Sequence, residues 1–155
     1  MPTIEYATVA NHAEALNGLL YLQGAGWTDM QVPFTPQGQP APVHLGIGVS
    51  VLVGWNETDQ QFPMQVSIVD EDGQQLVSVE AQVQAGRPQG LPPGSDLRTV
   101  LAINAEMQFP KDGGYELRTE LGQQTVTVAF RVHFPQQAAG GNSGSATSID
   151  LPPGL

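Results

Sequence analysis

Regular alternation between apolar residues and small or polar residues most limits the folds open to this chain. It is longest in residues 43–53, where every odd position is apolar and the even positions are mostly small or polar. Successive side chains of a β-strand point to opposite faces, so this pattern indicates a strand with one buried face. Five further stretches alternate in the same way: residues 64–68, 77–83, 101–109, 115–121 and 126–134. The sequence therefore predicts six strands.

Turn signals separate these stretches. Asp72-Gly73 and Gly122-Gln123 each suit a tight hairpin, whereas the consecutive Pro92 and Pro93 mark a longer connection, because they cannot join a hydrogen-bonded ladder. Strands joined by tight turns, with one face toward a core, are typical of antiparallel sheets. We therefore expect an all-β fold: an antiparallel two-sheet β-sandwich, immunoglobulin-like or jelly-roll-like, with about eight strands.

The first third of the chain is less regular. Residues 4–9 predict an opening strand, and a further short strand is expected near Val32. Residues 13–23 suit either an amphipathic helix or a hairpin that turns at Asn17-Gly18. Asn-Gly is a strong hairpin signal and Gly18 weakens a helix by about 1 kcal/mol, so we favour the hairpin, with a strand over residues 19–23.

Domain organisation follows from the length and from a change in composition. The 155 residues suit one domain with a real core, which we place at residues 1–134. Residues 135–155 are rich in Gly, Ser and Pro and show no periodicity, so we expect a flexible C-terminal tail.

The charge balance argues against several classes of partner. The formal net charge is −10 and only five residues are Lys or Arg, so no basic patch can form for nucleic acid or for an anionic membrane surface. The chain has no cysteine, and we read no signal peptide and no transmembrane segment. We expect a cytoplasmic protein without a cofactor.

An acidic stretch between Trp55 and Leu76 raises the question of a metal site. Asp70 and Asp72, with Glu71, precede a glycine, as calcium-binding turns often do. Glu57 and Asp59 lie at the other end of the intervening strand, roughly 20–25 Å away at the usual strand rise. We keep a calcium-dependent site at Asp70 and Asp72 as an alternative and favour a solvated hairpin turn.

The three histidines show no metal-binding spacing. His12, His44 and His133 form neither an HxH nor an HExxH pattern, so zinc has no sequence support. His44 and His133 fall on the polar faces of their strands and would approach each other if those strands paired. Surface positions are the simpler interpretation.

Two surface features suit binding rather than catalysis. Gly46, Gly48 and Ser50 leave one face of the longest strand nearly bare, which indicates either a docking groove for a partner or second copy, or cover by Trp27, Trp55 or the proline-rich loop. The two tryptophans could also serve as stacking platforms for a sugar or another small ligand.

Several segments resemble a family of uncharacterised bacterial proteins, mainly actinobacterial. The likeness covers about residues 4–134 and rests on the WNET and DEDG segments, on GLLY with GAGW, on GRPQGLPPGSDLR with AIN, and on PKDGGY. The chain departs at Phe62-Pro63, where the family usually has His-Arg, and at Ala25, where it has glycine. The resemblance implies a bacterial, cytoplasmic β-sandwich and supplies no activity.

These observations favour a non-enzymatic protein-binding or assembly module. No nucleophile elbow, phosphate loop or cysteine nucleophile supports an enzyme. The partner would be an unknown protein or a second copy of the chain. The alternatives are a small-ligand or carbohydrate-binding sandwich that uses Trp27 and Trp55, and the calcium-dependent domain.

Overall fold

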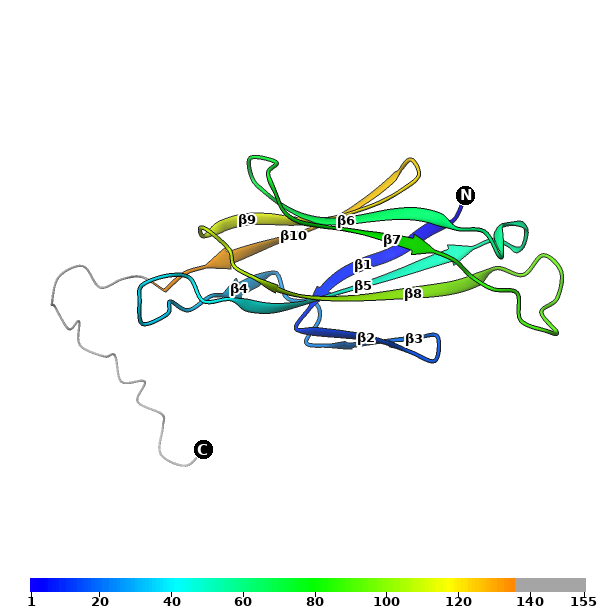
Figure 1. Cartoon of the computed structure of the whole chain (residues 1–155), viewed down its shortest axis with the longest axis horizontal. Coiled ribbons are helices and arrows are strands. Elements are labelled where there is room, and N and C mark those ends of the chain that lie inside the picture. The colour runs from blue at the N-terminus through cyan, green and yellow to red at the C-terminus, as the bar shows by residue number, and fades with distance from the viewer. Residues whose placement is uncertain (136–155) are drawn as a thin grey trace, which may run out of the picture.

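The computed structural model describes residues 1–135, and it is built from strands (Figure 1). The expectation of an all-β fold is confirmed. The elements in chain order are β1 (Thr3–Ala10), β2 (His12–Leu16), β3 (Leu19–Gln23), β4 (Asp29–Gln31), β5 (Val43–Val53), the 3₁₀ turn η1 (Trp55–Glu57), β6 (Phe62–Asp70), β7 (Gln75–Val83), β8 (Leu97–Met107), β9 (Gly113–Leu121) and β10 (Gln124–His133). Residues 1–135 contain no helix long and apolar enough to cross a membrane.

The strands form two larger sheets and one hairpin. The larger sheets have the orders β4-β10-β9-β6-β7 and β1-β5-β8, and β2 pairs only with β3. All pairings are antiparallel except that of β4 with β10. All six strands predicted from alternation are present. The short strand expected near Val32 corresponds to β4. The expected total of about eight is too low, and β2, which shows little alternation of its own, was not predicted as a separate strand.

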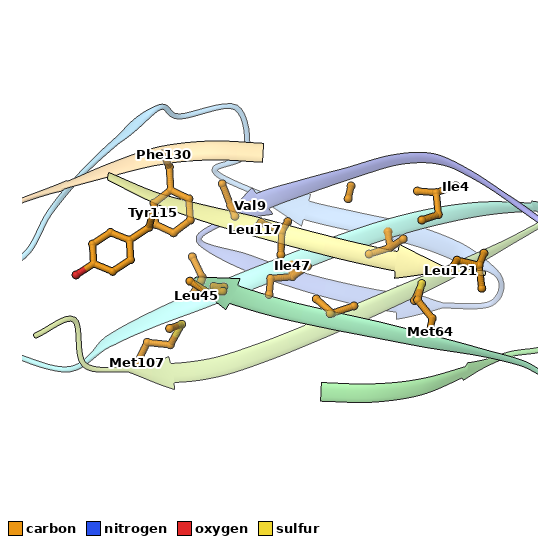
Figure 2. Packing of buried hydrophobic residues seen from close by; sticks show 14 of the residues in the cluster. Ile4, Val9, Leu45, Ile47, Met64, Met107, Tyr115, Leu117, Leu121 and Phe130 are labelled. Atoms are coloured by element: carbon orange, nitrogen blue, oxygen red, sulfur yellow. The ribbon is translucent and has the colours of Figure 1, made fainter. Parts of the chain in front are cut away.

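One hydrophobic core joins the two larger sheets (Figure 2). Ile47 comes from the three-stranded sheet, and Met64 and Leu117 come from the five-stranded sheet; each is at most 3 % exposed. At one end of the core, Phe109 and Phe130 pack edge-on against each other, and Tyr115 lies within about 6 Å of both rings. Strands such as β9 thus bury one face in this shared interior, as predicted, whereas β5 is buried on both faces over residues 45–51.

The β2–β3 hairpin confirms the Asn-Gly interpretation of the first third. Asn17 and Gly18 have φ values of 52° and 75°, which two-residue turns of type I′ require at both central positions. Leu16 faces Leu19 across the turn. The helix alternative for residues 13–23 is therefore wrong.

This hairpin lies over the three-stranded sheet as an additional layer. A Cβ added to Gly46 would lie 2.7 Å from the backbone of His12, and one added to Gly48 would lie 2.7 Å from a methyl group of Leu22. Ser50 is 1 % exposed and donates a hydrogen bond to Glu5. The expectation of an open docking groove at Gly46, Gly48 and Ser50 therefore needs correction: the chain's own hairpin covers that face, rather than the tryptophans or the proline-rich loop.

Most of the C-terminal segment is not among the residues that the structure describes. The expected flexible tail, residues 135–155, lies outside the described residues apart from Pro135.

Candidate functional site

A hollow of about 540 Å³ opens on the outer face of the five-stranded sheet, beside the turn that joins β6 to β7. Its walls come from β6, β9 and β10. Glu116, Arg118 and Arg131 alternate along their strands with buried core residues, so their side chains leave the sheet on the face opposite the core. Ala129, which is exposed, contributes a short side chain between them. Because the core residues face one side of the sheet, the polar residues between them line the concave surface on its opposite side.

The acidic turn at residues 70–73 forms one wall of the hollow, and its first aspartate has a structural role. Asp70 Oδ1 accepts hydrogen bonds from the backbone N–H groups of Asp72 and Gln74, each at 2.9 Å. Gly73 adopts a φ of 81°, a conformation that favours glycine. This is the turn chemistry expected of an aspartate that opens a hairpin.

Glu71 extends from the turn to the neighbouring strand. Its Oε1 accepts a hydrogen bond from the backbone N–H of Gly114 at 2.8 Å. A Cβ on Gly114 would lie 2.7 Å from that oxygen, so the carboxylate takes the space that a side chain would occupy. Beside it, Lys111 donates a hydrogen bond to Asp72 at 3.3 Å, and this contact raises the pKa of Lys111.

These contacts leave the calcium alternative without a ligand set. Residues 1–135 contain no group of three or more His, Cys, Asp or Glu side chains placed to hold a metal ion. Calcium takes six to eight oxygen ligands. Asp70 serves the turn and Asp72 is paired with Lys111, so the structure supports the interpretation of residues 70–73 as a hairpin turn.

The two arginines of the hollow are less engaged than the other described arginines. Arg118 Nη2 lies 3.8 Å from a Glu116 oxygen and Arg131 Nε lies 3.9 Å from an Asp29 oxygen, both beyond hydrogen-bond distance. By contrast, Arg98 donates two hydrogen bonds to Glu5. Within residues 1–135, neither guanidinium of the hollow donates a hydrogen bond to a protein group.

The second described arginine outside the hollow, Arg87, is also committed. It donates to the hydroxyl of Thr58 at 3.0 Å and to the backbone carbonyl of Trp55 at 2.8 Å. The free donors of the described guanidinium groups are therefore concentrated at the hollow.

Asp29, the acidic neighbour of Arg131, is already occupied. It accepts a hydrogen bond from His133 at 2.6 Å and another from the Thr28 hydroxyl at 2.8 Å. The bond from His133 is the largest of the effects that lower the pKa of Asp29. The carboxylate beside Arg131 thus has two shorter contacts with other partners, and the Arg131 side chain itself is 70 % exposed.

The histidines do not meet as the sequence allowed. His133 is on β10 with Asp29, whereas His44 is on β5 in the other sheet, 3.2 Å from His12 and 2.9 Å from Glu106. The condition for an approach of His44 to His133 is not met, because their strands belong to different sheets. The contact between His12 and His44 arises from the docked hairpin, which no spacing in the sequence reveals.

The two tryptophans are partly buried, and each packs against another side chain of the protein. Trp27 packs edge-on against Phe130, with ring centroids 5.5 Å apart. Trp55 carries the guanidinium of Arg87 over its ring at 3.8 Å. Trp55 lies shortly before the first residue of β6. Trp27 lies near the other end of β6, because its contact Phe130 pairs with Tyr115, and Tyr115 pairs with the last residue of β6. The predicted stacking platforms are therefore at opposite ends of β6 and do not form one site.

A second hollow, of about 510 Å³, lies on the same outer face toward the other end of the strands. Its lining includes Glu80 and Glu120 together with Gln65 and Gln82. No arginine or lysine lines it. The two hollows therefore differ in charge: the first has carboxylates and guanidinium groups, and the second has carboxylates without a cation.

These features define the class of molecule: an all-β protein of mainly antiparallel sheets, with a charged hollow on one outer face. The chain belongs to a family of unknown function (DUF6941), whose model matches residues 5–133. The match runs from within β1 to the last residue of β10 and so includes every strand that forms the hollow. No curated protein matches the sequence.

Proposed function

We propose that this protein is a non-enzymatic binding module and that the hollow beside the acidic turn is its binding site. The observation that carries the proposal is the pair of guanidinium groups, Arg118 and Arg131, which line a concave surface and donate no hydrogen bond within residues 1–135. Small-ligand sites are typically hollows of about 300–1,000 Å³ with a few well-placed polar groups. The hollow fits that description.

Rigid walls support binding. Asp70 and Glu71 are held in place by backbone N–H groups, so the wall they form has a defined shape before any ligand arrives. A preformed wall lowers the entropy lost on binding. The same bonds commit these carboxylates to structural roles, which favours a binding module over a catalyst.

We also propose a finer fold type and a cellular location for this protein. We place the two larger sheets in a sandwich of immunoglobulin-like or jelly-roll-like type, supported by their shared core. We also place the protein in the bacterial cytoplasm, supported by the absence of cysteine from the chain and by the family resemblance.

A fragment screen by ligand-observed NMR tests the site. Neutral, anionic, cationic and zwitterionic fragments would be offered to the native chain and to Ala129→Trp, which fills the hollow from an exposed strand position. Ser78→Trp is the matched control, because Ser78 is exposed on the same sheet outside both hollows. We expect binding to the native chain and to the control, and loss of binding in Ala129→Trp. Binding that survives in Ala129→Trp, or no binding at all, would overturn the proposal.

A second candidate function, self-association, is favoured by a different observation. The hairpin exposes Leu16, Leu19 and Tyr21, which are 57 %, 58 % and 50 % exposed. Leu16 and Leu19 are direct cross-strand partners, so they form one apolar tip. Light scattering over a range of concentrations would show a dimer in the native chain and a monomer in Leu16→Ser/Leu19→Ser; a native monomer at all concentrations would remove this candidate.

A further inference from the structure

We propose that the ligand of the hollow is a short peptide with a free ammonium and a free carboxylate group. Arg131 would bind the carboxylate, and Glu116 would bind the ammonium. This inference rests on the proposed function above and names the ligand class for the same site.

The charges around the hollow argue for a zwitterion. Its lining includes three carboxylates, those of Asp70, Glu71 and Glu116, and two guanidinium groups. A simple anion would approach three carboxylates on a chain of net charge −10, and a simple cation would approach two arginines. A ligand with one charge of each sign avoids both repulsions.

Arg131 is the better-placed of the two guanidinium groups for a carboxylate. Its side chain is 70 % exposed, and its acidic neighbour, Asp29, is bonded to His133 and Thr28. Arg118 is only 37 % exposed and has Glu116 beside it at 3.8 Å. A planar guanidinium can donate two parallel hydrogen bonds to a carboxylate, which a lysine cannot.

Glu116 provides the opposite charge. It is 34 % exposed, lies 3.8 Å from Arg118 and accepts no hydrogen bond within residues 1–135. Glu71, by contrast, is bonded through Oε1 to Gly114, the cross-strand partner of Arg131, and so belongs to the other end of the hollow. Glu116 therefore suits an ammonium group, which can donate hydrogen bonds to its free carboxylate oxygens.

The spacing fits a ligand of two or three residues. Arg131 is paired with Gly114, and Glu116 is two residues further along β9, about 7 Å at the usual strand rise. An extended peptide advances about 3.5 Å per residue, so the ends of a dipeptide or tripeptide span this separation. Ala129, the cross-strand partner of Glu116, has a small side chain that leaves room above the sheet.

Four forms of one tripeptide test the inference. Ala-Leu-Ala with free ends, its N-acetyl form, its C-amide and the doubly blocked form would be titrated into ¹⁵N-labelled full-length protein, with affinities taken from amide shifts. We expect the free tripeptide to bind at the hollow, each singly blocked form to bind about tenfold more weakly, and the doubly blocked form about a hundredfold more weakly, as loss of one or two charge-assisted hydrogen bonds predicts.

Variants assign each charge to its partner. Arg131→Gln should weaken the free tripeptide to the level of the C-amide and leave binding of the C-amide unchanged. Glu116→Gln should weaken the free tripeptide to the level of the N-acetyl form and leave binding of the N-acetyl form unchanged. Arg98→Gln, which removes an exposed arginine of the other sheet, is the control and should change neither affinity.

The outcomes separate the two proposals. Equal affinity of all four forms for the hollow would overturn the zwitterion inference while leaving the hollow as a binding site. Shifts at the hollow from anionic fragments alone would also overturn it. If no fragment and no peptide form shifts the hollow residues, the proposed function fails as well.

Discussion

The side-chain amide of Asn104 forms two hydrogen bonds with the backbone of a single residue, Ala13. It accepts a bond from the Ala13 N–H at 3.0 Å and donates one to the Ala13 carbonyl at 2.7 Å. Asn104 is on β8, and its cross-strand partner on β5 is Gly46, whose bare Cα lets the hairpin backbone approach. The Asn104 side chain thus forms the two backbone hydrogen bonds that a neighbouring strand would otherwise form with Ala13, and these bonds attach the hairpin to the sheet.

Replacing Asn104 by alanine should loosen this attachment. Ala13 is 0 % exposed, so its N–H and carbonyl would lose their partners in a buried position, and we expect a loss of about 1–3 kcal/mol in unfolding free energy. Urea denaturation would measure it, with hydrogen exchange at the Ala13 amide as a local readout. Asn56→Ala, at an exposed position, is the control and should change stability by less than about 0.5 kcal/mol. Equal exchange rates in both variants would contradict the attachment.

A methyl group at Gly46 should displace the hairpin. The added Cβ would lie 2.7–2.8 Å from backbone atoms of His12 and Ala13, which cannot rotate away. We expect Gly46→Ala to destabilise the protein by about 1–3 kcal/mol, as overpacking does. Gly86→Ala is the matched control, since its Cβ would meet only a side-chain oxygen of Asp59 at 3.9 Å. Thermal unfolding of both variants gives the comparison, and equal melting temperatures would mean that the hairpin is not held against this face.

Calcium should leave the melting temperature unchanged. Residues 1–135 supply no group of three metal-binding side chains, and Asp70 is bonded to the turn backbone. A ligand that binds only the folded state raises the melting temperature, so millimolar calcium and EDTA should give superimposable curves. A rise with calcium that disappears in Asp72→Asn would restore the metal interpretation of the acidic turn.

Acid should weaken the Glu5–Arg98 contact. The two hydrogen bonds from Arg98 are the first cause of the lowered pKa of Glu5, and a bond from Ser50 adds to it. A carboxyl group whose pKa is lower in the folded state stabilises that state above its ordinary range near pH 4, and this stabilisation is lost as the pH falls through the depressed pKa. Glu5→Gln should therefore lose less stability than the native chain between about pH 5 and pH 2. Parallel acid titrations of the unfolding midpoint would show this, and identical slopes would contradict it.

Replacing Arg87 by lysine should destabilise the protein. The guanidinium lies over the Trp55 ring and donates to Thr58 and to the Trp55 carbonyl, which joins the GRP segment to the WNET segment. Lysine keeps the charge but loses the planar stacking and the two-directional donors, so we expect a loss of about 1 kcal/mol. Denaturation followed by tryptophan fluorescence would measure it. Unchanged stability would show that the charge alone is sufficient.

The strands were predictable because burial of one face leaves a period of two in the sequence. The hairpin turn was predictable because Asn17 and Gly18 both adopt positive φ, which few other residue pairs tolerate. The docking of that hairpin on β5 was not predictable. Gly46 and Gly48 show that something lies close, but only the folded chain shows that it is the backbone of residues 12–13 and the side chains of Leu20 and Leu22.

The hollow was beyond sequence reasoning for a related reason. Its walls come from β6, β9 and β10, and strand order cannot be read from alternation. Arg118 and Arg131 were visible only as two of five cationic residues. The signal that could have drawn attention to them is their scarcity: in a chain of net charge −10, two arginines at outward strand positions near an acidic turn are a local exception.

Gly46, Gly48 and Asn104 together supply what the extra layer needs, which is room for a backbone and a hydrogen-bond partner for it. We expect a related chain with glycine at both positions and asparagine opposite the first to accommodate a strand pair against this sheet. We expect a related chain with branched side chains at those positions to present that face to water or to another molecule.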